Sequence, residues 1–200
     1  ATPIWWDAAR PPSLSMRGVP ATCDVAIIGA GIAGLSAALE LARAGRSVQV
    51  FDRQRPGSGA ASHNAGIVSA SLPVGFTALG RARGEDTAKR MYREAHLAQQ
   101  DLVALIRDAH IQCDYQPTGA VFAAVNTSQL DSLAREAQFC QADLGIEAYT
   151  ALGAELEQEV LAQGYAGALI RADAGALHPA RLHAALLTLA MNAGVQIHGE

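Results

Sequence analysis

The segment from Thr22 to Asp52 constrains the fold of this chain most strongly, because three local patterns follow one another without a gap. Thr22–Ile28 is a short apolar run rich in Val and Ile, which predicts a buried parallel strand. Small and apolar residues recur at helical spacing from Ile32 to Ala44, and Gly45 follows where a left-handed helix cap is expected. Ser47–Phe51 predicts a second strand. The segment therefore predicts a β–α–β unit.

The turn between the first strand and the helix has the pattern GxGxxG. The first glycine permits a tight exit from the strand, the second lets the backbone approach a pyrophosphate, and the third allows close packing of the helix. Free amides at the start of the helix, together with its dipole, favour a diphosphate. The turn predicts a dinucleotide site at Gly29, Ala30, Gly31, Ile32, Ala33 and Gly34.

An acidic residue ends the second strand. Asp52 lies 18 residues after Gly34, where a carboxylate accepts hydrogen bonds from the adenosine ribose, and its charge disfavours the 2′-phosphate of NADP. The alternative is an incidental acid that follows a glycine-rich turn. This pattern does not separate FAD from NAD, because both contain ADP.

The remaining patterns outline the rest of the chain. Residues 1–21 contain four prolines and are predicted to form an N-terminal arm, with Trp5 and Trp6 burying their rings. Residues 53–73 predict a loop. Helices are predicted at 84–109, 128–144 and 179–193, and strands at 119–125, 167–172 and 195–198. Asn126, Thr127 or Ser128 could cap the helix at 128–144.

Composition excludes several classes of protein. Fifteen Lys and Arg against nineteen Asp and Glu give a formal net charge of −4, so no nucleic-acid partner is expected. The three cysteines, Cys23, Cys113 and Cys140, are too few and too widely spaced for a disulfide framework or a zinc site, and no metal is expected. The fifteen uncharged residues at 25–39 fall short of the about 20 that a membrane helix needs. We therefore expect no integral membrane segment and a cytoplasmic location.

The histidines lack the spacing of metal ligands. His96, His110, His183 and His198 are predicted to be surface or satisfied core residues. His178 precedes a predicted helix, so it is expected to act as a cap or turn residue rather than as a base.

Three segments carry a resemblance to a known family. They are GAGIAGLSAALELARAGRSVQVFDR at 29–53, GAASHNAGIV at 59–68 and GALHPARL at 175–182. Together they resemble the FAD-dependent D-amino acid oxidase superfamily, which includes glycine oxidase and D-amino acid dehydrogenase. The start of the chain, with Trp6, Asp7 and Ala8, is similar to the branch that includes gamma-glutamylputrescine oxidoreductase.

The resemblance implies an α/β fold with a doubly wound FAD-binding Rossmann-like domain and part of an interleaved antiparallel substrate domain. Residues 22–80 and 171–200 would form an incomplete FAD-binding domain, and 81–170 a crossover helix and a partial substrate domain. Family members are much longer, so the chain is expected to be truncated. The catalytic residues are unknown, because they are expected beyond Glu200.

The resemblance also implies that the segment Ser58–Ile67, in the loop after Asp52, passes near the pyrophosphate and the flavin, although a flexible surface loop is the alternative. Together with the turn, it makes the expected cofactor residues Gly29, Ala30, Gly31, Ile32, Ala33, Gly34, Asp52, Arg53, Ala61, Ser62, His63, Asn64, Ala65, Gly66 and Ile67. In dimethylglycine dehydrogenase-like members a histidine placed like His63 carries covalent flavin. Here Ser62 replaces the usual aromatic neighbour, so noncovalent FAD is expected and a covalent link is the alternative.

The implied activity is oxidation of the C–N bond of an amine or amino acid. A hydride equivalent would move to flavin N5 and leave an imine that water hydrolyses, and electrons would pass to oxygen or another acceptor. The alternatives are a flavin-dependent 2-hydroxy acid dehydrogenase, a non-catalytic truncated FAD-binding fragment, and an NAD enzyme without flavin.

Overall fold

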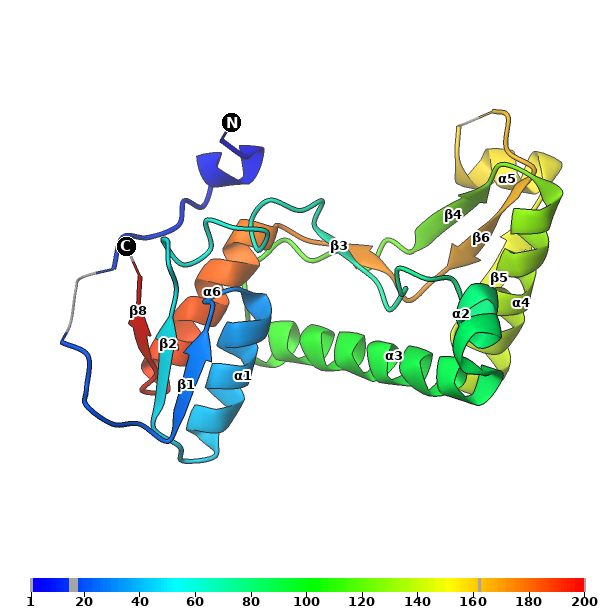
Figure 1. Cartoon of the computed structure of the whole chain (residues 1–200). Helices are drawn as coiled ribbons and strands as arrows, with labels where there is room; N and C mark the ends of the chain where they lie inside the picture. Colours follow the sequence, from blue (N-terminus) through cyan, green and yellow to red (C-terminus); the bar gives the residue numbers. More distant parts are fainter. Residues whose placement is uncertain (1, 15–17, 162, 200) are drawn as a thin grey trace. The chain divides into compact units, whose positions relative to one another are not determined.

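The computed structural model describes residues 2–14, 18–161 and 163–199 (Figure 1). The chain forms two compact units, each assembled from separate stretches of sequence. The first contains Ala1–Gly66, Ala109–Asp114 and Leu177–Glu200, and the second contains Ile67–Asp108 and Tyr115–Ala176. The chain therefore passes between the units more than once.

A parallel sheet organises the first unit. Its strands are β1 (Val25–Ile28), β2 (Val48–Phe51) and β8 (Gln196–His198), in the order β1-β2-β8. Val25 lies opposite Val48, and Gln49 lies opposite Gln196. The three strands predicted in these regions are confirmed, each shorter by one to three residues than its predicted range.

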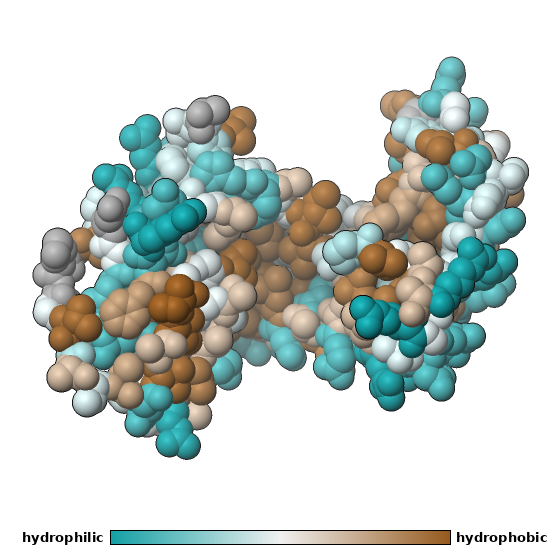
Figure 2. All heavy atoms as spheres, in the orientation of Figure 1, coloured by the Kyte–Doolittle hydropathy of each residue, from teal (hydrophilic) through white to brown (hydrophobic). Residues whose placement is uncertain are grey.

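Two helices pack beside each other against this sheet. They are α1 (Ile32–Arg43) and α6 (Pro179–Asn192), both close to their predicted ranges. Gly45 has the left-handed backbone predicted after α1, with φ of 80°. Ile28, at the end of β1, is 85% exposed, and Figure 2 shows apolar side chains gathered over β1 and β2. The buried apolar residues of the two helices are Leu35, Ala38, Leu39, Leu182, Leu186, Leu187 and Ala190.

The start of α6 has the predicted cap. The Nδ1 atom of His178 accepts a hydrogen bond from the Arg181 N–H at 3.3 Å, and Pro179 occupies the first turn. The Cys113 carbonyl accepts a hydrogen bond from the His178 N–H at 2.7 Å, and Asp114 pairs with Arg181 at 2.6 Å. These contacts attach the short stretch around Cys113 to the first unit.

An antiparallel sheet organises the second unit. Its strands are β4 (Ala120–Ala124), β5 (Ala148–Ala151) and β6 (Gly167–Arg171), in the order β4-β6-β5. Successive strand residues point to opposite faces. Leu169 accordingly packs with α4 (Thr127–Leu144), whereas Ala168 packs with α5 (Gly153–Glu159). Asn126 is the cap of α4, because its side chain accepts a hydrogen bond from the Gln129 N–H at 2.9 Å.

Two consecutive helices complete the second unit. They are α2 (Phe76–Arg83) and α3 (Glu85–Asp108), of which only the longer was predicted. Phe76 stacks on Phe139 with ring centroids 4.4 Å apart, and Tyr92 meets both rings edge-on. This aromatic cluster joins α2, α3 and α4 in one core.

A buried ion network lies in the same unit. Arg171 is fully buried, and its Nε and Nη2 atoms donate to the two Asp173 oxygens at 3.0 and 2.8 Å. Its Nη1 lies 3.3 Å from Glu136 Oε1 and 3.4 Å from Ser71 Oγ. Burial raises the pKa of Tyr92, which stays protonated and donates to Glu136 at 3.4 Å. The buried cation is therefore compensated on several sides.

The units do not divide at the boundaries expected at residues 80 and 171. Residues 67–80 and 171–176 lie in the second unit, and 109–114 lie in the first. An unpredicted two-residue pairing joins β3 (Ile67–Val68) to β7 (Gly175–Ala176), so these two segments stay together, and both lie in the second unit. Among the helices of the described ranges, none is both long and apolar enough to cross a membrane.

Candidate functional site

The glycine-rich turn lies between β1 and α1, as the sequence predicts. Gly29 has φ of 100°, and its N–H donates to the Phe51 carbonyl at 2.7 Å. A Cβ atom at Gly34 would overlap the Gly29 carbonyl oxygen, so close packing of helix and turn requires glycine at that position. A Cβ atom at Gly31 would meet nothing within 4 Å, because this backbone borders open space.

The N-terminus of α1 is available to an anion. Gly31 is the cap residue and supplies no side chain, and the first turn of α1, all of it within the described ranges, carries no acidic residue. The first N–H groups of a helix have no partner inside the helix, and the dipole makes this end positive. The end of α1 can therefore bind a phosphate or diphosphate.

The Asp52 carboxylate points toward the turn. Its Oδ2 accepts a hydrogen bond from the Ala30 N–H at 2.8 Å, and its Oδ1 accepts one from the Gln54 N–H at 3.0 Å. An ionised carboxylate has about four acceptor positions, so about two remain for another donor. The Asp52 N–H donates to the His198 carbonyl at 2.8 Å, which fixes the carboxylate relative to the sheet.

A pocket of about 570 Å³ opens at this turn. The predicted residues that line it are Gly29, Gly31, Ile32, Ala33, Gly34, Asp52, Arg53, Ala61 and Asn64. Its other lining residues were outside the predicted set and are Ile28, Gln54, Gly57, Ser58, Gly59 and Ala60. The turn and the loop after Asp52 thus form two walls of one pocket.

Six predicted residues do not line the pocket, namely Ala30, Ser62, His63, Ala65, Gly66 and Ile67. Ala30 is fully buried behind it. Ile67 belongs to the second unit. His63 is exposed, and its Nδ1 lies 2.9 Å from the Gly59 carbonyl oxygen.

The loop is held by its own hydrogen bonds. The Ser62 hydroxyl donates to the Gly57 carbonyl at 2.6 Å, and the Asn64 amide donates to the carbonyls of Ala60 and Ala61. The Gly66 N–H donates to Asn64 Oδ1 at 2.8 Å. These hydrogen bonds all lie within the loop itself.

His183 supports both walls of the pocket from behind. Its Nε2 lies 2.7 Å from the Ala30 carbonyl oxygen, and a Cβ atom at Gly57 would clash with its ring. Burial lowers the pKa of His183, so the imidazole is neutral and Nε2–H donates to Ala30. The prediction of a satisfied core histidine is confirmed. Its link to the turn was missed, although its spacing to Leu186 and Leu187 places it on the buried stripe of α6.

Within the described ranges, no three His, Cys, Asp or Glu side chains form a group that could hold a metal ion. Cys23, Cys113 and Cys140, which all lie in those ranges, form no disulfide.

Several known proteins resemble this chain in sequence or in fold. The chain is 33% identical over 162 residues to gamma-glutamylputrescine oxidoreductase of Escherichia coli, covering 80% of this chain and 38% of that relative. The structure of L-amino acid deaminase from Proteus myxofaciens matches 96% of this chain and 41% of that one, with a TM-score of 0.77 and 18% identity. Glycine oxidase from Geobacillus kaustophilus matches 88% and 46%, with a TM-score of 0.68 and 25% identity.

The chain thus spans less than half of the length of each of these proteins. The family model described as FAD dependent oxidoreductase, DAO, matches residues 24–200, which include the turn, the loop and the whole of α6. The match confirms the resemblance inferred from the three sequence segments. The chain therefore belongs to the DAO family of FAD dependent oxidoreductases.

Proposed function

We propose that the first unit binds FAD in the pocket at the glycine-rich turn. The N-terminus of α1 holds the diphosphate, and Asp52 accepts hydrogen bonds from the adenosine ribose. The observation that carries this proposal is the joint position of Asp52 and the turn, where the carboxylate lies one hydrogen bond from Ala30 at 2.8 Å. The first unit is thus the FAD domain, and the second unit is part of the substrate domain.

The chemistry of the pocket fits this cofactor. A diphosphate needs close backbone approach, and the side of Gly31 that would carry a Cβ atom is open. The ribose hydroxyls need an acceptor, and Asp52 keeps acceptor positions beyond those used by Ala30 and Gln54. Arg53 also lines the pocket and contributes a positive charge beside the anion.

The proposed reaction is oxidation of the C–N bond of an amine or amino acid. The 33% identity to gamma-glutamylputrescine oxidoreductase supports an amine substrate. Bound FAD would supply the oxidant: it would take a hydride equivalent from the C–H bond beside the nitrogen, water would hydrolyse the imine product, and oxygen or another acceptor would take the electrons from the reduced flavin. The role of this chain is to bind and orient the cofactor, and none of its residues is assigned as an acid or base.

We propose that the FAD is held noncovalently. The His63 ring does not line the pocket, and its Nδ1 bonds to the Gly59 carbonyl at 2.9 Å. Acid precipitation of the FAD-loaded chain should leave the yellow colour in the supernatant. Colour that stays in the pellet, and is lost in His63→Ala, would instead establish a covalent link.

The site is tested by titrating the chain with FAD and following the quenching of flavin fluorescence. Asp52→Ala should weaken FAD about tenfold or more, because hydrogen bonds to a charged acceptor contribute about 1.5–3 kcal/mol. The matched control is Asp101→Ala, since Asp101 is an exposed acid of α3 outside the pocket. FMN, which lacks the adenosine, should bind far more weakly than FAD. Equal affinity of FMN and FAD, or an Asp52→Ala variant with unchanged affinity, would refute this site.

The substrate class is tested separately with a redox dye as electron acceptor. If the FAD-loaded protein turns over substrate, it should reduce the dye with an amine or an amino acid and not with the matching 2-hydroxy acid; no turnover with either would favour the alternative of a non-catalytic FAD-binding fragment. Turnover of the hydroxy acid alone would replace C–N oxidation by C–O oxidation and leave the FAD site intact.

A further inference from the structure

Two tryptophans of the N-terminal arm bond to the loop that forms one wall of the pocket. They lie in a short 3-10 helix, η1 (Ile4–Asp7). The Trp6 Nε1–H donates to Ser62 Oγ at 2.7 Å, and the Ser62 hydroxyl donates onward to the Gly57 carbonyl at 2.6 Å. The Trp5 Nε1–H donates to the Asn64 carbonyl at 2.9 Å. Trp6 and Gly57 are thus connected through a single hydroxyl.

The hydrogen bonds from the two tryptophans lead to residues that line the pocket. Gly57 and Asn64 both line it, and Gly57 also packs against the ring of His183. Ser62 lies behind the wall and is 1% exposed, so its hydroxyl has no water to replace a lost partner. A substitution of Trp6 can therefore shift the pocket wall through Ser62, although Trp6 itself does not line the pocket.

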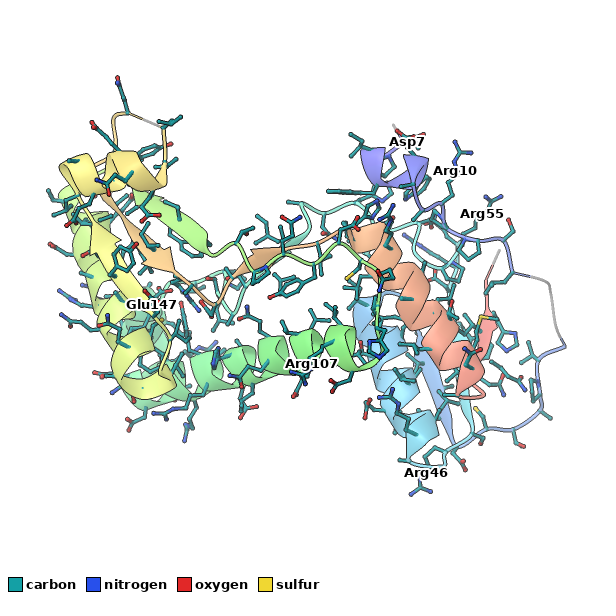
Figure 3. The ribbon with its side chains drawn as sticks, turned by 180° about the vertical axis from the view of Figure 1, so that it is seen from behind. Asp7, Arg10, Arg46, Arg55, Arg107 and Glu147 are labelled. Carbon is teal, nitrogen blue, oxygen red and sulfur yellow. The ribbon has the colours of Figure 1, made fainter. Side chains whose placement is uncertain are left out.

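Ring contacts accompany these bonds. Trp6 meets His63 edge-on with ring centroids 5.2 Å apart, and Trp5 meets His178 in the same way at 5.0 Å. No ion pair joins the arm to the loop among residues 2–14 and 18–66. Arg10 of the arm and Arg55 of the loop, labelled in Figure 3, line the same cavity of about 170 Å³, and their like charges disfavour docking. The two indole groups provide the hydrogen bonds and the ring contact that join the arm to the loop.

We propose that Trp6 is a positioning residue for FAD, acting through Ser62 to hold the loop from Gly57 to Asn64 in its binding conformation. A loop that is already ordered in the free protein loses less conformational entropy on binding, so the ligand binds more tightly. The hydroxyl relay is directional, because the indole can only donate and the Gly57 carbonyl can only accept. This role rests on the proposed FAD site.

The first test replaces Trp6 by Phe, which keeps an aromatic ring beside His63 and removes the N–H donor. Amide hydrogen exchange across residues 57–66 of the FAD-free chain should become about tenfold faster, and FAD should bind about fivefold to tenfold more weakly. The matched control is Ile4→Ala, because Ile4 belongs to the same 3-10 helix and is 75% exposed. This control should change neither measurement.

A double-mutant cycle separates positioning from a general structural effect. Ser62→Ala should weaken FAD by about as much as Trp6→Phe, since each breaks the same relay. The combined variant should be no weaker than the stronger single variant. Independent effects, whose fold-changes multiply, would overturn the relay even if both residues stabilise the fold.

The outcomes distinguish this role from the FAD site itself. Unchanged exchange in Trp6→Phe would overturn the positioning of the loop. Faster exchange with unchanged FAD affinity would overturn its link to the cofactor and leave the proposed function standing. If the wild-type chain does not bind FAD at all, the proposed function fails and the role toward FAD fails with it, whichever way the exchange responds.

Discussion

The N–H and the carbonyl of Ala30 are both hydrogen-bonded to side chains that are distant in the sequence. Its N–H donates to Asp52 at 2.8 Å, and its carbonyl accepts from His183 at 2.7 Å. A carboxylate in front and an imidazole behind thus fix the turn that Gly29 and Gly34 allow to form. His183 reaches this position from α6, more than a hundred residues later in the sequence.

The histidine gives the turn a pH dependence with a definite sign. Burial lowers the pKa of His183 below its usual 6.5, and the hydrogen bond to Ala30 and the neighbouring Asp52 charge only partly offset this effect. As the pH falls below 6.5, the unfolded chain binds a proton before the folded chain does, so the free energy of unfolding decreases. Urea unfolding at pH 7.5 and 5.5 should show this loss, and His183→Gln should show less of it. If the free energy of unfolding changed equally with pH in the wild type and in His183→Gln, His183 would not be the source of this pH dependence.

Two glycines of the turn should separate folding from ligand binding. Gly31→Ala places its methyl group in open space and keeps an ordinary φ of −80°, so stability should stay within about 0.5 kcal/mol while FAD affinity falls steeply. Gly34→Ala overlaps the Gly29 carbonyl and should cost about 1–3 kcal/mol of stability. Thermal unfolding and FAD titration of both variants test this pair. Equal loss of stability in both would mean that the second glycine serves folding rather than ligand approach.

For single residues, the sequence predicts those roles that depend only on neighbours along the chain. The roles of Gly29, Gly34 and Asp52 follow from a strand, a turn and a helix that are adjacent along the chain, and the structure places all three at the pocket. The support from His183 depends on how α6 packs, and no local pattern contains that information. The same holds for Gly57, which lay in a predicted loop without periodicity, whereas the resemblance placed the segment from Ser58 onward near the cofactor.

Elements with a long or strong pattern were predicted, and most of the very short ones were not, with the three-residue β8 as the exception. The apolar period of α3 extends over 24 residues, and β1 and β2 are Val- and Ile-rich. By contrast, β3 and β7 contain two residues each and form by pairing with each other, with a further bridge between Gln116 and Ala176. The unpredicted α5 and β5 of the second unit contain seven and four residues, so tertiary contacts decide them rather than propensity.

The ion network of the second unit joins β6 to α4, and breaking it should strongly lower the free energy of unfolding. Arg171→Ala leaves Glu136 and Asp173 buried without their cation, with an expected loss of about 3–5 kcal/mol in urea unfolding. Arg93→Ala is the control, because its pair with Asp143 is partly exposed and should contribute about 0–1 kcal/mol. A similar loss of unfolding free energy in the two variants would show that burial does not determine how much the Arg171 ion pairs stabilise the protein.

Across the whole chain, each unit draws on stretches that are far apart in sequence. Parallel strands β2 and β8 are neighbours in the sheet although about 145 positions separate them. The resemblance predicted that the chain crosses between domains several times, but the crossing points depend on contacts such as that between Cys113 and His178. The compact units therefore differ from the division expected at residues 80 and 171 by up to about 14 residues, and the assignment of FAD and substrate domains stays a prediction.

This discontinuous construction predicts how FAD should stabilise the molecule. A ligand that binds only the folded form adds about 2.7 kcal/mol at a concentration 100 times its dissociation constant. Because Ala30 is bonded to His183 and Gly57 packs on the same ring, FAD should slow amide exchange in three separated stretches: residues 25–52, residues 57–66 and α6. Strands β4, β5 and β6 belong to the other compact unit and should change little. Hydrogen exchange with and without FAD checks this pattern. Protection confined to residues 25–52 would show that the support from α6 is not coupled to the cofactor, and His183→Ala should then leave FAD affinity unchanged.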